Sequence, residues 1–200
     1  MKPIGMSSER RTKVRFKMSE TKFVQTVNAQ GQPEAGGQAT KETVIPVTTE
    51  LQLEGGGVFW LIIERERDGQ KEREILQIKN LITDLGLDIM IRNLINVNPV
   101  SISYIVISDS TTDPSPGETT MPGTNKWAQS ATVSRPNARQ ARWQASWSQG
   151  AIVGTIGSIG LCSDSAGNNL FARVKLSTPK QVGSEDTVSV VYDLTLNRQS

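Results

Sequence analysis

Three acidic side chains lie close together in one Pro- and Gly-rich segment of this 200-residue chain. Asp109, Asp113 and Glu118 carry carboxylate oxygens, the ligands that Ca²⁺ prefers in proteins. Their spacing lacks the Asp-x-Asp-x-Asp-Gly pattern of a dedicated calcium loop. Asp side chains in such segments also bond their own backbone and stabilise turns. We therefore expect a long irregular loop over residues 109–123, whose three acids contact a partner protein, and no metal site.

Glycines recur every third residue at Gly154, Gly157 and Gly160, which superficially resembles a phosphate-binding loop. The spacing fits neither the dinucleotide fingerprint nor the P-loop, and no lysine follows the last glycine. Glycine inside a strand often marks a bend or a close approach of two backbones. We interpret this segment as a bulged or tightly packed strand.

Aromatic side chains offer a second kind of binding chemistry. Trp127, Trp143 and Trp147 could stack on sugar rings if they lay on an exposed face. Trp143 and Trp147 share strand parity and alternate with polar residues, however, which favours core packing. A carbohydrate-binding module that uses Trp127 or Trp147 to recognise host glycans therefore stays as the alternative function.

The chain has no histidine and a single cysteine, Cys162. Histidine is the usual general base and the commonest metal ligand, so Ser/His/Asp and Cys/His catalysis are excluded within one chain. One cysteine excludes an internal disulfide and a thiolate-based zinc site within the chain. We expect Cys162 to be a small buried apolar residue. Carboxylate-only or lysine chemistry stays formally open, but we expect no enzyme and no cofactor.

Positive charge is concentrated at the N-terminus, although the formal net charge of the whole chain is only +2. Residues 1–22 hold seven basic side chains and two acidic ones. Such an arm could release counterions from nucleic acid, or it could dock on an acidic protein surface. It contains one aromatic residue among its charges and no recognised nucleic-acid fold follows it, so we favour a protein partner. The candidate contact residues of the arm are Arg10, Arg11, Lys13, Arg15, Phe16 and Lys17.

The remaining elements must position these groups. Residues 1–40 read as a flexible basic arm and polar linker, and residues 41–200 as one β domain. Apolar side chains alternate with polar ones over residues 170–176 and 188–196, which places Arg173 and Lys175 on the solvent face of their strand. We expect a break at residues 55–57, a hairpin over 58–79 with an Asp-Gly turn, and a helix over about 81–95. The predicted fold is a mostly β, antiparallel, jelly-roll-like sandwich with one short helix and an extended N-terminal arm.

No stretch approaches the ~18 consecutive apolar residues that a membrane span needs. The N-terminus also lacks the apolar core of a secretory signal. We expect a soluble product of intracellular synthesis that contacts no membrane.

A resemblance of pattern extends over about residues 57–196. Residues 57–60 (GVFW) lead into the Asp-Gly hairpin, and residues 79–88 read KNLITDLGLD. The strand 102–108, the Thr- and Pro-rich segment 110–116 and the pair GSIGL and LFAR near the C-terminus follow. This order is similar to small structural proteins of tailed bacteriophages, in which an Asn-Leu-Ile/Val-Thr-Asn/Asp-x-Gly-Leu stretch leads into a short helix.

The resemblance implies a structural protein of the phage tail, collar, baseplate or fibre adaptor, or one that decorates the capsid. It supplies no catalytic residues and does not include the basic arm. We therefore expect a virion component, made in the host cytoplasm, that forms homo-oligomers and binds other virion proteins of the capsid, neck or tail.

Overall fold

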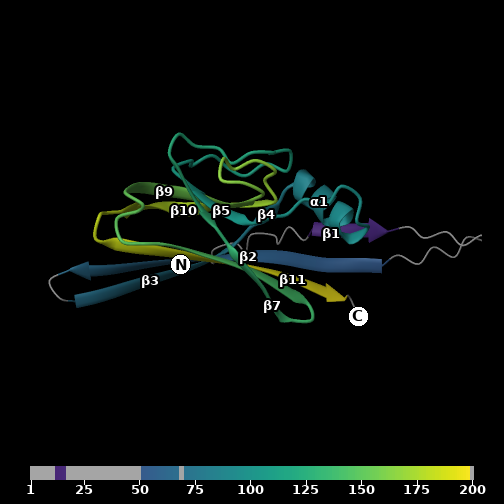
Figure 1. Cartoon of the computed structure of the whole chain (residues 1–200), viewed down its shortest axis with the longest axis horizontal. Coiled ribbons are helices and arrows are strands. Elements are labelled where there is room, and N and C mark those ends of the chain that lie inside the picture. Colours follow the sequence, from purple (N-terminus) through teal and green to yellow (C-terminus); the bar gives the residue numbers. More distant parts are fainter. Residues whose placement is uncertain (1–11, 17–50, 68–69, 199–200) are drawn as a thin grey trace, which may run out of the picture.

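The computed structural model describes residues 12–16, 51–67 and 70–198, which form two antiparallel sheets and one helix (Figure 1). The chain is mostly β, and the predicted two-sheet fold is confirmed. The first sheet has the order β1-β2-β11-β8-β7, with β3 also paired to β2. Its strands are β1 Thr12–Phe16, β2 Leu51–Arg67, β3 Gln70–Lys79, β7 Thr132–Asn137, β8 Gln140–Trp147 and β11 Asp186–Arg198.

The second sheet has five strands in the order β4-β10-β9-β5-β6. Its surface toward the first sheet supplies much of the core, and α1 lies at one end of the two layers (Figure 1). The bounds are β4 Leu81–Ile82, α1 Asp84–Leu94, β5 Tyr104–Ser108, β6 Lys126–Ser130, β9 Gly154–Cys162 and β10 Ala172–Val182.

The long pair β2 and β11 forms the centre of the first sheet. Phe59 lies opposite Tyr192 and Leu61 lies opposite Val190, and all four side chains are fully buried. The rings of Phe59 and Tyr192 pack with their centroids 4.6 Å apart. Directly paired residues share a face of the sheet, so this register places the apolar side chains of both strands in the core. The alternation over residues 188–196 thus has the predicted orientation.

The expected break at residues 55–57 is wrong, because β2 continues through all three glycines and stays paired with β11. Gly57 has a packing reason. A Cβ at this position would overlap the hydroxyl of Tyr192 and the side-chain oxygen of Asn80. Asn80 donates from its amide to the Tyr192 hydroxyl at 3.3 Å, and burial raises the pKa of this phenol. Glycine therefore makes room here for a buried polar contact.

The chain passes from the first sheet to the second at Asn80, between β3 and β4, and then enters α1. Thr83 is the N-cap of the helix: its Oγ1 accepts from the backbone N–H of Gly86 at 2.9 Å and donates to the carbonyl of Leu170 at 2.5 Å. Ile89 is fully buried and anchors the helix on the core. Of the described helical segments, none combines the length and apolar character needed to cross a bilayer.

Two loops form an additional layer on the outer face of the second sheet. The loop over residues 109–123 and the segment 163–171 meet in an isolated bridge between Thr120 and Asn168. Figure 1 shows both loops on the side of β5 and β9 that faces away from the first sheet. Beneath them lies a small apolar cluster separate from the main core, which consists of Val106, Met121, Cys162 and Leu170. Cys162 is fully buried, as the sequence predicts.

Candidate attachment surfaces

The described part of the basic arm is strand β1. It pairs with β2 in antiparallel register, from Thr12 opposite Gly55 to Phe16 opposite Leu51. It occupies the same edge of β2 as β3, which begins its pairing at Val58. Backbone pairing thus joins the arm to the first sheet. The candidate contact residues Lys13, Arg15 and Phe16 lie in β1, while Arg10, Arg11 and Lys17 lie outside the described residues.

Asp109 ties the start of the 109–123 loop to its end. Its two carboxylate oxygens accept from the backbone N–H groups of Thr124 and Asn125 at 2.9 and 3.0 Å, and from the Asn125 amide at 2.8 Å. Desolvation alone would raise the pKa of Asp109, but these hydrogen bonds outweigh it and hold the pKa below its ordinary value. The carboxylate therefore holds the two ends of the loop together.

Glu118 fastens the middle of the loop to the second sheet through Arg173. The guanidinium donates to Glu118 Oε1 at 2.6 Å. It also donates to the Ser110 hydroxyl at 3.1 Å, and to the carbonyl and hydroxyl of Thr112 at 2.8 and 3.1 Å. Arg173 is 0% exposed, so the loop covers it completely. A charge at this depth is tolerated because it is paired and extensively hydrogen-bonded.

The predicted solvent exposure of Arg173 is therefore wrong, although its parity is right. Arg173 does point away from the sandwich core, but residues of the 109–123 loop cover that face. A strand alternation shows which face a side chain takes, and it contains no signal for a distant loop that packs on that face. Arg173 is the structural residue of this surface that the sequence analysis missed.

Asp113 makes the third connection, at the exposed rim of the loop. Lys175 donates to its Oδ1 at 2.8 Å. The hydrogen bond and charge of Lys175 lower the pKa of Asp113 below its ordinary value of 3.8. The three predicted loop acids thus do not converge on one site: each carboxylate contacts a different partner within the chain. Of the three side chains, that of Asp113 is 88% exposed and is the most accessible to another molecule.

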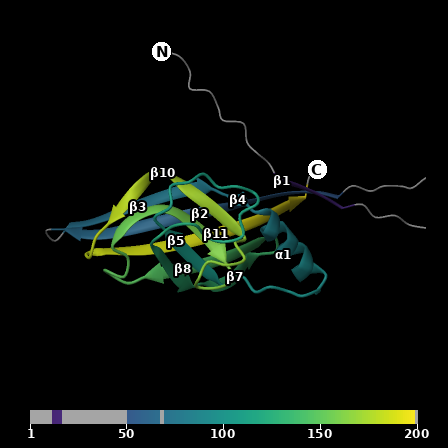
Figure 2. The ribbon, with the colours of Figure 1, turned by 90° about the horizontal axis from the view of Figure 1, so that it is seen from above.

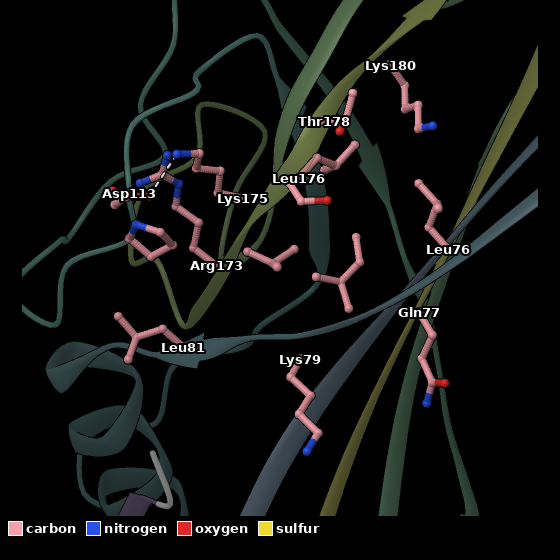
Figure 3. A pocket seen from close by; sticks show the side chains of 14 residues that line it. Leu76, Gln77, Lys79, Leu81, Asp113, Arg173, Lys175, Leu176, Thr178 and Lys180 are labelled. Atoms are coloured by element: carbon pink, nitrogen blue, oxygen red, sulfur yellow. Dashed lines mark hydrogen bonds and ion pairs between the residues drawn. The ribbon is translucent and has the colours of Figure 1, made fainter. Parts of the chain in front are cut away.

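A cavity of about 580 Å³ opens between the edges of β3 and β10 (Figure 3). Figure 3 shows Asp113, Lys175 and Arg173 gathered at one end of the cavity and Lys180 at the other. Lys180 forms an ion pair with Glu74 of β3 at 2.5 Å, which joins the two sheets. The wall is otherwise largely apolar and includes Leu76, Ile78, Leu81, Val174 and Leu176.

A local irregularity of β10 shapes this cavity. The register of β10 against β9 shifts between Lys175 and Lys180, so that several residues of β10 bulge out of the ladder. The cavity is thus a gap between two strand edges. Three of the cations that line it, Arg173, Lys175 and Lys180, are each bonded to an acid, and the pair of Lys180 with Glu74 spans the gap.

The tryptophans do not form a shared stacking platform. Trp147 is only 6% exposed and belongs to the main core. Trp143 donates from its ring nitrogen to the carbonyl of Ile102 at 2.8 Å and packs on Tyr192. Trp127 is half-buried against the core. The burial of Trp147 argues against its use in glycan binding. The packing of Trp143 and Trp147 agrees with the interpretation that their alternation with polar residues reflects core packing.

Metal ligands do not cluster in the described ranges 12–16, 51–67 and 70–198: no group of three or more His, Cys, Asp or Glu side chains there is placed to hold an ion. Compared with known proteins, the chain matches no family model, no curated protein sequence and no solved structure. Its function is therefore inferred from the sequence pattern and from the geometry of this molecule.

Proposed function

We propose that the chain is a non-enzymatic structural component of a tailed bacteriophage particle, attached to other virion proteins of the capsid, neck or tail. One observation carries the proposal. Asp109 holds the two ends of the 109–123 loop together, and Glu118 and Asp113 fasten the loop to the second sheet through ion pairs with Arg173 and Lys175. Carboxylates used in this way stiffen a body that holds its neighbours in place. The resemblance of residues 57–196 to small phage structural proteins supports the same conclusion.

The basic arm supplies the means of attachment. Its described part already joins a sheet edge by backbone pairing, as strand β1. Pairing of this kind is a general mode of recognition between an extended segment and a sheet. The excess of basic side chains in residues 1–22 fits an acidic surface on the partner protein. Copies repeated in a symmetric particle raise the effective concentration for each weak contact.

Removal of the arm tests this proposal. The phage that encodes the chain should be complemented with protein that lacks residues 1–22, and incorporation into purified particles should be measured by quantitative gel. We expect incorporation to be lost while circular dichroism still shows a folded β body. The second, matched variant replaces the six arm residues Arg10, Arg11, Lys13, Arg15, Phe16 and Lys17 with Ser in the full-length chain, which separates the loss of contact side chains from the loss of residues.

The control variant carries Arg73→Ser and Lys126→Ser, which remove two exposed cations of the body and leave the arm intact. We expect this protein to be incorporated as the wild type is. If the chain without residues 1–22 enters particles at the wild-type copy number, the arm is not the anchor, and attachment must use another surface. If the control fails as severely as the arm variants, total charge rather than the arm governs incorporation.

A further inference from the structure

The C-terminal end of α1 presents an unusually apolar tip. The turn after the helix is held rigidly, because the Asn93 side chain accepts from the Val100 N–H at 2.7 Å and donates to its carbonyl at 2.9 Å. Asn96 and Asn98 take positive φ angles of 54° and 45°, which asparagine tolerates better than most residues. We call the exposed side chains the α1 tip: Ile91 at 38% exposed, Leu94 at 75%, Ile95 at 59% and Val97 at 51%.

An apolar groove lies on the first sheet, where β7 and β11 end and β8 begins. It encloses about 570 Å³, and its lining contains no residue of the second sheet. Leu194 lies opposite Ala141 and is 7% exposed, whereas Val133 on the edge strand is 53% exposed. The core-facing surface of the first sheet therefore extends past the second sheet, and the groove lies on this uncovered part. We call it the end groove, lined by Val133, Ala141, Leu194, Leu196, Arg135 and Arg139.

The α1 tip and the end groove lie toward the same end of the molecule. Figures 1 and 2 both show α1 on the side toward which β11 runs, and the groove residues Leu194 and Leu196 lie near the end of β11. The high exposure of Leu94 and Ile95 shows that the tip does not fill the groove of its own chain. A tip and a groove at one end can be exchanged reciprocally by two copies related by a two-fold axis.

We propose that the α1 tip of one copy binds in the end groove of a second copy, and that two-fold symmetry repeats the contact in the opposite direction. Apolar side chains then leave water on both surfaces, which drives association. Charge complementarity orients the contact. The C-terminal end of a helix carries a partial negative charge, and Arg92 in the last turn of α1 is already paired with Asp88 at 2.8 Å, so the exposed Arg135 and Arg139 supply the matching cations at the groove. This interface does not require the arm, so it goes beyond the proposed attachment function.

Rigidity of the tip favours this interface. The two hydrogen bonds between Asn93 and Val100 fix the turn before any partner binds. A segment that is already ordered loses less conformational entropy on association than a mobile one. Each copy contributes one tip and one groove, so the dimer contains two equal contacts and leaves neither surface open.

The test is the oligomeric state of the full chain. Sedimentation and light scattering should be measured from about 1 µM to about 100 µM, the range over which a micromolar dimer becomes populated. We expect the wild type to shift from monomer toward a mass twice that of one chain. Leu94→Lys should raise the dissociation constant about tenfold or more, since it replaces a buried apolar contact with a cation that faces two arginines. A cation in the last helical turn also favours the helix, so folding is retained.

A groove variant and a control sharpen the test. Val133→Asp places an acid where the negative helix end binds, and it should weaken the dimer similarly. Val153→Lys is the matched control, because Val153 is 57% exposed and lies outside both the tip and the groove. We expect this control to dimerise as the wild type does.

Mixing the two variants provides a diagnostic result. A hybrid of Leu94→Lys and Val133→Asp chains retains one intact tip–groove contact, and its altered contact brings the introduced cation of one chain near the introduced acid of the other. We expect the mixture to dimerise more tightly than either variant alone. The proposal is overturned if the wild type stays monomeric, as when residues 17–50 or another protein cover the groove. It is also overturned if assemblies larger than a dimer form, if Val153→Lys weakens association equally, or if mixing has no effect.

Discussion

At the residue scale, Arg173 organises the most irregular part of the molecule. Its guanidinium contacts Ser110, Thr112 and Glu118, and thereby fixes a loop that has little regular secondary structure. The pair with Glu118 is asymmetric in its exposure, since the arginine side chain is 0% exposed and the glutamate side chain 21%. Loss of the arginine would leave a partly buried carboxylate without a cation, and this defines a stability test.

Arg173→Met should lower the free energy of unfolding by about 2 to 3 kcal/mol, because methionine keeps much of the apolar stem but leaves the Glu118 carboxylate without its cation. Urea unfolding of the purified chain measures the change. Arg135→Met is the control, since that side chain is exposed, and it should change stability by less than about 0.5 kcal/mol. Equal stability of Arg173→Met and the wild type would show that the loop does not depend on this charge.

Cys162 provides a pH-dependent test of the small apolar cluster beneath the loops. Burial raises the pKa of its thiol from 9.0 to about 12. The folded state therefore keeps the proton at a pH where the unfolded chain releases it. The resulting stability is fully present below about pH 9 and is lost as the pH rises from there toward about 12.

We expect the difference in unfolding free energy between the wild type and Cys162→Ala to shift against the wild type above pH 9. Urea titrations at several pH values measure this, and the alanine variant cancels the contributions of other titrating groups. A thiol reagent at pH 9 should also label the native chain slowly and the urea-unfolded chain at once. Rapid labelling of the native chain would contradict the burial of Cys162.

At the scale of elements, the placement of α1 depends on a close approach of backbones. A Cβ at Gly86 would overlap the carbonyl oxygen of Phe171, the residue just before β10. Thr83 bonds to the same segment, through its backbone N–H to Phe171 at 3.0 Å and its hydroxyl to Leu170. Glycine weakens a helix in isolation, and here it allows the first helical turn to lie against the second sheet.

Gly86→Ala should therefore destabilise the chain by about 1 to 3 kcal/mol, although alanine has the higher helix propensity. Thermal or urea unfolding measures the effect. Gly117→Ala is the matched control, because a Cβ there meets nothing within 4 Å, and its stability should stay near the wild-type value. A stabilised Gly86→Ala variant would mean that helix propensity outweighs the contact with Phe171.

The regular elements could be largely predicted from the sequence, because their signals are local. The hairpin expected over 58–79 corresponds to β2 and β3, whose register leaves two residues between Arg67 and Gln70. The helix expected over about 81–95 corresponds to α1, but it begins only at Asp84, after the cap Thr83, because Leu81 and Ile82 pair with β10 as strand β4. The continuation of β2 through residues 55–57 could not be predicted, because it depends on pairing with β11, more than a hundred residues away.

At the scale of the whole molecule, the candidate surfaces were harder to foresee than the fold. The acids Asp109, Asp113 and Glu118 could be placed on one loop from the sequence, but their separate partners depend on long-range packing. The end groove likewise depends on how far the two sheets overlap, since no residue of the second sheet lines it. Loop packing and sheet overlap leave no periodic pattern in the chain, so only the assembled structure reveals them.

The two proposals depend on different surfaces of the molecule. Attachment depends on the basic arm, whereas self-association depends on the α1 tip and the end groove. A chain without residues 1–22 should therefore still form the dimer, and Leu94→Lys should still carry an intact arm. Parallel measurements of both variants would show which of the two surfaces governs assembly into a particle.

The most direct test of the central proposal is the copy number of this chain in purified particles of the phage that encodes it, measured by quantitative gel. We predict that the chain sediments with intact particles at a fixed ratio to the other virion proteins. Hundreds of copies would indicate a capsid decoration, and about a dozen or fewer a neck, baseplate or fibre part. Absence of the chain from particles, with the full amount left in the host lysate, would contradict the proposal.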